Sequence, residues 1–231
     1  MNKGEVSPDT IINVWQRSPH IRKIYYTWYE NLLKSIPIKN HYKILEIGCG
    51  VGLFANYLTL LKNVEYVGID INSKAILYAK RLRKLDFIKC NAENLPFKEK
   101  VFDIVIGIDI LHHCNTKLAI KEVSRVIKKG GYCGFIEPVP GMAQKIITSL
   151  FNFHEDVKKY PSIKNLKRYL NENHFEITNN IFSDTLLYPL SGGFSRRDLI
   201  FFDFHKLRKI DSFLSKFNYL NWKTTIICKR L

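Results

Sequence analysis

The 231-residue sequence has few cysteines, no long apolar run and few acidic residues. None of its five cysteines forms a C-x-x-C pair or lies at zinc-ligand spacing from a histidine. We therefore expect no metal site and no structural disulfide, as is typical of a reducing compartment. No apolar stretch reaches the length of a bilayer span, and the opening MNKGEVSPDT has no signal-peptide apolar region. These features predict a cytoplasmic protein.

Acidic side chains are outnumbered by basic ones. The chain has 36 Lys and Arg against 21 Asp and Glu, which gives a formal net charge of +15. A basic surface attracts nucleic acid, anionic membranes or acidic small molecules. The same charge is also expected from a lysine-rich composition whose side chains are simply solvated. Charge alone leaves these interpretations open.

Apolar runs alternate with amphipathic patterns through the first part of the chain. Such alternation predicts a parallel sheet with helices on both faces. The predicted strands are 43–48, 64–70, 85–90, 101–108, 132–137, 176–186 and 220–231. The predicted helices are 53–63, 74–84, 118–131, 145–152 and 162–175. The helix at 74–84 begins after Asn72 or Ser73, either of which can cap it, and the helix at 118–131 is closed by glycine.

Three glycines, Gly48, Gly50 and Gly52, directly follow the first of these strands, and Glu46 lies inside it. Ligands of open parallel sheets lie at the carboxyl ends of the strands, where glycine permits a tight turn and a close approach. The dinucleotide fingerprint G-x-G-x-x-G needs Gly or Ala at the position of Leu53. The acid in the strand instead favours a ligand that carries a positive group.

Five segments in order resemble one family. They are ILEIGCGVG, VGIDIN, KCNAENLPF, FDIVIGIDILHH and SRVIKKGGYCGFIEP, and together they extend over about 43–138. The chain is similar to the Rossmann-like (class I) S-adenosylmethionine-dependent methyltransferases, in particular to the small-molecule type 11 group. The resemblance implies S-adenosyl-L-methionine as the cofactor. It also implies methyl transfer to a small-molecule or lipid-linked acceptor, on oxygen or carbon.

The resemblance assigns the cofactor contacts residue by residue. Glu46 and the glycine turn would meet the methionine end, Asp70 the ribose hydroxyls, and Ile71 one face of the adenine. One position departs from the family pattern, since Asn91 stands where the family usually has Asp, although an amide oxygen still accepts a hydrogen bond. The complete predicted set is Glu46, Gly48, Cys49, Gly50, Asp70, Ile71, Asn91, Ala92, Glu93, Ile108 and Asp109.

The candidate catalytic residues lie after the fourth and fifth predicted strands. They are His113, His112, Asp109 and Glu137. His113 is our first choice as a general base for an oxygen acceptor, because histidine ionises near pH ~6.5. The alternative is that the paired histidines only shape the pocket. There is no N-P-P-Y or D-P-P-Y run of the kind usual for amino-group methylation of bases.

The resemblance also implies a fold. We expect a single α/β methyltransferase domain, 1–231, with a three-layer Rossmann-like architecture. Its sheet has seven mostly parallel strands with an antiparallel last strand. The expected parts are an N-terminal helical cap at 1–40, a cofactor-binding core at 41–137 and a substrate-side half at 138–231. In the first of these, His20, Tyr25, Tyr26 and Trp28 form either a lid over the cofactor or an aromatic cap on the core.

A helical insertion is expected at 188–219, between the last two strands. It mixes apolar and basic residues at near-helical spacing. Three interpretations fit it: peripheral membrane contact through 196–217, the wall of a pocket for a greasy substrate, or a helix packed on the sheet with solvated lysines. Two other functions stay open, an RNA or protein methyltransferase and a non-catalytic cofactor-binding subunit. The sequence carries no signal for the oligomeric state.

Overall fold

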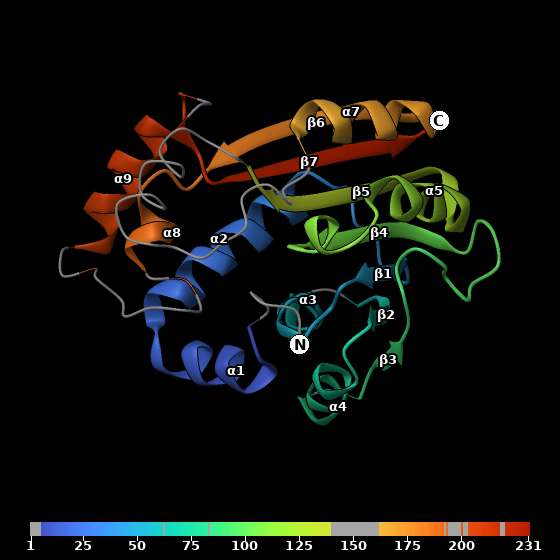
Figure 1. The fold of residues 1–231 in the computed structure, drawn as a ribbon, viewed down its shortest axis with the longest axis horizontal. Coiled ribbons are helices and arrows are strands. Elements are labelled where there is room, and N and C mark those ends of the chain that lie inside the picture. The colour runs from blue at the N-terminus through green and yellow to red at the C-terminus, as the bar shows by residue number, and fades with distance from the viewer. Residues whose placement is uncertain are drawn as a thin grey trace.

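The structure, a computed structural model, describes residues 6–61, 63–82, 84–139, 162–191, 193, 200, 203–217 and 220–231 (Figure 1). Within these residues it contains one seven-stranded sheet in the order β3-β2-β1-β4-β5-β7-β6. The strands are β1 (Lys43–Ile47), β2 (Glu65–Asp70), β3 (Asp86–Lys89), β4 (Phe102–Ile108), β5 (Ile127–Pro138), β6 (Phe175–Ser183) and β7 (Lys223–Arg230).

The sheet is parallel from β3 to β5, and β7 runs antiparallel between β5 and β6. This confirms the predicted mostly parallel sheet with an antiparallel last strand. In the ladder, Ile47 of β1 is paired with Ile69 of β2 on one side and with Gly107 of β4 on the other. The carboxyl ends of β1, β2 and β4 therefore meet at one edge of the sheet.

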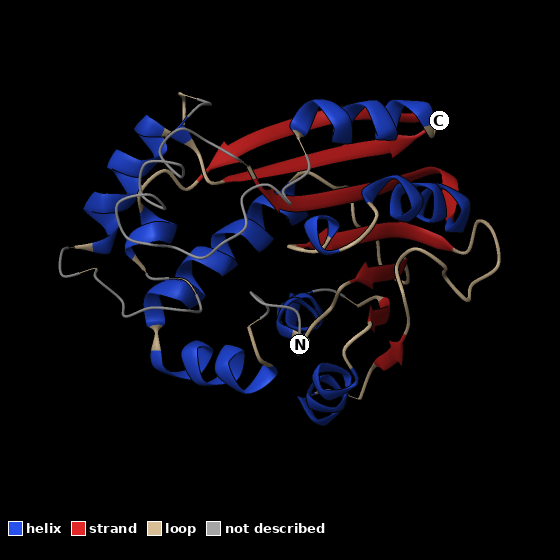
Figure 2. Ribbon diagram, viewed as in Figure 1, coloured by secondary structure: helices blue, strands red, loops and turns tan. Residues whose placement is uncertain are grey.

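Helices cover both faces of the sheet, so the predicted three layers are present (Figure 2). One apolar cluster joins the sheet to α2, α3 and α4, and the other joins it to α5 and α7. The helices are α1 (Pro8–Arg17), α2 (Pro19–Lys34), α3 (Leu53–Leu61), α4 (Ser73–Leu82), α5 (Thr116–Val126), α7 (Ile163–Glu172), α8 (Leu187–Leu190) and α9 (Phe204–Leu214), with a 3-10 turn, η1 (Leu111–His113).

Polar side chains define several helix starts. The side chain of Asn72 accepts hydrogen bonds from the backbone N–H groups of Lys74 and Ala75, at 3.0 and 3.2 Å, which settles the predicted choice of cap for α4. Asn115 and Ser162 cap α5 and α7 in the same way. A capping side chain satisfies backbone donors that the first turn leaves without partners.

The predicted helix over 118–131 was too long. It ends at Val126, and β5 begins at Ile127 rather than at Tyr132. Ile127 pairs with Phe102, and the register then shifts, so that Gly130 with its φ of +77° lies in a bulge of the strand. The glycines therefore do not close the helix as local sequence rules suggest.

Other boundaries differ by a few residues. The strands predicted at 176–186 and 220–231 occupy Phe175–Ser183 and Lys223–Arg230. The helix expected at 145–152 lies outside the described residues. Within the insertion expected at 188–219, the described helical residues are the end of α8 and all of α9.

The α2 helix belongs to the core. Its Tyr25, Trp28 and Leu32 are buried, and Leu32 lies where a side chain at Gly134 of β5 would be, 2.7 Å from the position of a Cβ. Glycine at 134 thus lets the helix approach the strand closely. Tyr25 and Trp28 are thus packed as the aromatic-cap interpretation predicts, and the lid over the cofactor stays a prediction.

This packing predicts a large effect of Leu32→Ala. Removing a fully buried leucine leaves a cavity and should lower the free energy of unfolding by about 2 to 5 kcal/mol, measured by urea denaturation. The matched control is Leu60→Ala on α3, where the side chain is 65% exposed and the expected change is below about 0.5 kcal/mol. Equal effects of the two substitutions would contradict the integration of α2 into the core.

Candidate active site

The glycine turn after β1 adopts a backbone that favours glycine. Gly48, Gly50 and Gly52 have φ values of +69°, +52° and +82°. A Cβ at Gly48 would lie 2.6 Å from the Ile110 side chain, whereas a Cβ at Gly50 would meet nothing within 4 Å. The turn is therefore packed against the loop after β4 on one side and borders open space at Gly50.

Asp70, at the end of β2, faces this turn. Its Oδ2 accepts from the backbone N–H of Gly50 and its Oδ1 from that of Asn72, both at 2.8 Å. An ionised carboxylate has about four lone-pair sites, so acceptor capacity remains for a diol. Next to it the Ile71 side chain is 66% exposed and offers an apolar surface to a flat ring. The residues present fit an adenosine group.

Glu46 is buried in β1 and accepts a hydrogen bond from the Tyr66 hydroxyl. Burial raises the pKa of Glu46 to about 8, against the lowering effect of the Tyr66 hydrogen bond, and the charge of Asp70 raises it further. The carboxyl group is therefore largely protonated near neutral pH, and a ligand cation would favour its ionised form. Burial also raises the pKa of the Cys49 thiol far above its ordinary value, so this cysteine is no nucleophile.

The predicted adenine segment follows β3. The Oδ1 of Asn91 accepts from the Glu93 backbone N–H at 3.0 Å, which uses one lone pair of the amide oxygen. Ala92 is buried. Glu93 has a structural contact instead. Its Oε1 accepts a hydrogen bond from the Asn115 backbone N–H at 2.8 Å and so fixes the loop before α5.

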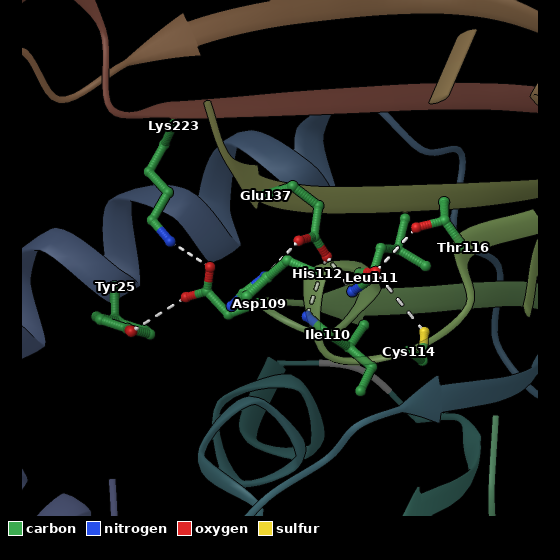
Figure 3. A network of polar contacts seen from close by, with 9 residues as sticks. All are labelled: Tyr25, Asp109, Ile110, Leu111, His112, Cys114, Thr116, Glu137 and Lys223. Atoms are coloured by element: carbon green, nitrogen blue, oxygen red, sulfur yellow. Dashed lines mark hydrogen bonds and ion pairs between the residues drawn. The ribbon is translucent and has the colours of Figure 1, made fainter. Parts of the chain in front are cut away.

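Glu137 organises the loop between β4 and α5 (Figure 3). Its Oε1 accepts from the backbone N–H groups of Ile110 and Leu111, at 3.0 and 2.8 Å, and its Oε2 lies 2.9 Å from His112 Nδ1. The Leu111 carbonyl in turn accepts from the Thr116 hydroxyl at 2.9 Å. Among the four catalytic candidates, Glu137 and His112 are thus engaged in holding this loop.

The other two candidates differ in their surroundings. His113 lies on η1 with an exposed side chain, and its ring centroid is 4.0 Å from that of His112. Asp109 directly follows Ile108, the last residue of β4, and has a φ of +54°. Its Oδ1 forms an ion pair with Lys223 of β7, and its Oδ2 accepts from the Tyr25 hydroxyl at 3.4 Å (Figure 3).

Sequence reasoning missed Lys223. The side chain of this lysine is 4% exposed, and that of Asp109 is 25% exposed. Its Nζ lies 5.1 Å from the ring centroid of Trp28 and 5.3 Å from that of Tyr188. The only signal in the sequence is a lysine directly before the buried run TTIIC, a pattern that equally suits a solvated strand end.

A second carboxyl group lies on the same wall. Trp28 donates its Nε1–H to Asp184, which follows β6. Burial raises the pKa of Asp184 to about 7, the charge of Asp211 raises it further, and the charge of Lys223 lowers it. The carboxyl edge of the sheet thus brings together the Asp109 carboxylate, the Lys223 ammonium group and the aromatic rings of Trp28 and Tyr188.

The comparisons with known proteins agree with this geometry. Residues 45–135 match the family model described as a methyltransferase domain. A phthiotriol/phenolphthiotriol dimycocerosates methyltransferase of Mycobacterium tuberculosis is 38% identical over 103 residues, which are 42% of this chain and 38% of that protein. A fatty-acid O-methyltransferase of Mycolicibacterium smegmatis is 34% identical over 103 residues, with the same coverage. The match therefore spans less than half the length of these relatives.

Solved structures show the same fold. The geranyl diphosphate C-methyltransferase of Streptomyces coelicolor, in complex with Mg²⁺, geranyl diphosphate and S-adenosyl-L-homocysteine, has a TM-score of 0.70 at 13% identity over 91% of this chain and 80% of that chain. A protein of Pyrococcus horikoshii has a TM-score of 0.65 at 19% identity over 93% of this chain and 92% of its own. The predicted resemblance and fold class are confirmed.

Glu46 makes a testable contribution to stability. Its pKa is about 8 in the folded protein against an ordinary 4.5, so the folded state holds an extra proton between these values. The resulting stability is present in full below pH 4.5 and is lost as pH rises toward about 8. The variant Glu46→Gln has no carboxyl group to titrate at this position. Its free energy of unfolding should therefore rise relative to that of the wild type by about 1 kcal/mol per pH unit between pH 4.5 and about 8.

Urea denaturation at a series of pH values measures this difference. The matched control is Glu176→Gln on β6, which makes the same substitution at an exposed position. A constant difference between Glu46→Gln and the wild type would contradict the buried, protonated state of Glu46.

Proposed function

We propose that this chain, which carries a Rossmann-like methyltransferase domain over residues 45–135, transfers a methyl group from S-adenosyl-L-methionine to a small-molecule or lipid-linked acceptor. The observation that carries the proposal is the left-handed glycine turn, whose Gly50 borders open space and donates its N–H to Asp70. A nicotinamide dinucleotide is disfavoured by Leu53, which stands at the third position of the dinucleotide fingerprint.

The cofactor residues divide by chemistry. Asp70 holds the ribose hydroxyls, Ile71 covers the adenine, and Asn91 and Ala92 contact its edge. Glu46, with the turn from Gly48 through Cys49 to Gly50, holds the methionine end, and Glu93, Ile108 and Asp109 complete the wall. When bound, the cofactor supplies a methyl group that is already activated on a sulfonium. The chain then has to orient an acceptor and exclude water.

The acceptor lies on the side formed by residues 138–231, under the cap of residues 1–40, all within one domain. The rings of Trp28 on α2, which is buried, and of Tyr188 on α8 lie near Lys223, the partner of Asp109 on this side. An apolar wall with few polar groups suits a greasy acceptor methylated on oxygen or carbon. The relatives named for phthiotriol, a fatty acid and geranyl diphosphate support this class. We propose Asp109 or His113 as the group that assists an acceptor hydroxyl.

Labelling tests the function. We expect purified protein to transfer tritium from methyl-labelled S-adenosylmethionine into the organic-soluble fraction of an extract of its own organism lacking the gene. Asp70→Ala removes the diol acceptor and should reduce the transfer at least tenfold, because hydrogen bonds to charged groups contribute about 1.5 to 3 kcal/mol each.

The other fractions separate the rival functions. Label in RNase-sensitive material or in protein would contradict the lipid-like acceptor and favour an RNA or protein methyltransferase. Absence of label in every fraction, with cofactor still bound, would contradict catalysis and favour a cofactor-binding partner subunit. Equal labelling by Asp70→Ala would contradict the role of this carboxylate.

We also propose that α9 makes peripheral contact with an anionic membrane. Phe213 is 58% exposed, and Ile210 and Phe217 are exposed near it. The Nζ of Lys216, two residues after α9, lies 5.7 Å from the Phe213 ring centroid, and Lys206, Arg208 and Lys209 of α9 are exposed. Exposed aromatic and basic side chains on a helix and the turn that follows it suit the interface of an anionic bilayer. Among the helices that the structure describes, none is long and apolar enough to cross a membrane.

Vesicle sedimentation tests this contact. We expect binding to phosphatidylglycerol vesicles and little to phosphatidylcholine vesicles. The triple substitution Ile210→Ser, Phe213→Ser and Phe217→Ser should weaken the binding at least fivefold by removing buried apolar area. The matched control is Leu77→Ser on α4, an exposed leucine on another basic helix. A triple variant that binds like the wild type would contradict the proposal.

A further inference from the structure

Lys223 stands out in the charge pattern of the protein. The chain has 36 lysines and arginines, and among the residues that the structure describes this is the one that is buried. Four carboxyl groups are buried in the same set of residues, those of Glu46, Glu137, Asp184 and Asp211. Burying an ammonium group is costly unless it is paired. The burial of the Lys223 ammonium group must therefore be explained by the groups around it.

The surroundings of Lys223 come from four elements. Its ammonium pairs with Asp109 after β4 and lies near the rings of Trp28 on α2 and Tyr188 on α8. Its charge also reaches Asp184, whose pKa it lowers. Asp109 is the partly exposed member of the ion pair, with a side chain 25% accessible against 4% for Lys223. Figure 3 shows the Asp109 carboxylate held between the ammonium group of Lys223 and the hydroxyl of Tyr25.

Asp109 lies beside the glycine turn. It follows β4 at the edge where β1 ends, and the next residue, Ile110, packs where a side chain at Gly48 would be. Burial raises the pKa of Tyr29, and the charges of Glu46 and Asp109 raise it further. Tyr29 therefore lies within electrostatic reach of both carboxyl groups. The charge of Asp109 acts on whatever occupies this edge of the sheet.

We propose that Lys223 is a positioning residue that acts through Asp109: it holds this carboxylate in place and offsets its charge at the methyl-transfer edge. The inference rests on the proposed function. Methyl transfer moves the methyl to the acceptor and leaves the electron pair of the broken C–S bond on sulfur, so a sulfonium becomes a neutral thioether. An uncompensated carboxylate nearby would stabilise the charged methyl donor more than the transition state, which slows transfer.

Binding measurements test this without any acceptor. S-adenosylmethionine and S-adenosylhomocysteine differ in one methyl group and the sulfonium charge. Lys223→Met keeps an unbranched apolar side chain among the aromatic rings but removes the ammonium. We expect the ratio Kd(S-adenosylhomocysteine)/Kd(S-adenosylmethionine), measured by calorimetry, to rise about fivefold to tenfold, as an uncompensated charge at several ångströms in a partly screened site would produce.

Companion variants separate charge from structure. Lys223→Arg keeps the charge and should leave the ratio near the wild-type value. Asp109→Asn leaves the ammonium uncompensated and should lower the ratio. In the double variant Lys223→Met with Asp109→Asn, the ratio should return toward the wild type. Circular dichroism confirms that each variant is folded, and Asp109→Asn is an independent test if Lys223→Met does not fold.

An unchanged ratio in both Lys223→Met and Asp109→Asn would overturn the inference. This includes an equal loss of affinity for both ligands, which is what a purely structural role predicts. A wild-type protein that binds neither ligand would contradict the proposed function itself, so the two failures are distinguishable.

Discussion

The buried carboxylate of Glu137 is the constraint on which the site depends. Its two oxygens hold the backbone of Ile110 and Leu111 and the ring of His112. This fixes the loop after β4, so that Ile110 packs against the glycine turn and Asp109 turns toward Lys223. A buried carboxylate without these hydrogen-bond donors would lower the stability of the fold. Without the carboxylate, the loop would lose all three of these hydrogen bonds. The loop thus connects the glycine turn with the Asp109–Lys223 ion pair.

The charge of the protein is divided between exterior and interior. The chain as a whole is strongly basic, yet most of the Asp, Glu, Lys and Arg side chains that are buried among the described residues carry a carboxyl group. A ligand cation would favour the ionised form of such a group, because opposite charge and partial desolvation strengthen the attraction. The exposed basic residues then serve other tasks, of which contact with an anionic membrane through α9 is the one that we propose. Lys223 is the exception, and the positioning role that we propose for it follows from its contacts with Asp109, Trp28 and Tyr188.

Much of the site follows from local sequence, and its remainder depends on distant contacts. The strands around the glycine turn and the cap at Asn72 are encoded by neighbouring residues, and so is the position of Asp70 at the end of β2. Gly130 was misassigned to a helix end, because its strand pairing with β4 is not visible locally. From the sequence alone Glu137 is a candidate catalytic base, and only the folded loop shows which donors its carboxylate satisfies. The burial of Lys223 arises from α2, α8 and β4 together, so no single segment predicts it.

The central claim is that the glycine turn and Asp70 form a site for S-adenosylmethionine rather than for a dinucleotide. Calorimetric titration of the wild-type protein with S-adenosylhomocysteine, and in parallel with NAD, tests it most directly. The account predicts saturable one-to-one binding of S-adenosylhomocysteine and no detectable binding of NAD. Tight binding of NAD without binding of S-adenosylhomocysteine would contradict it.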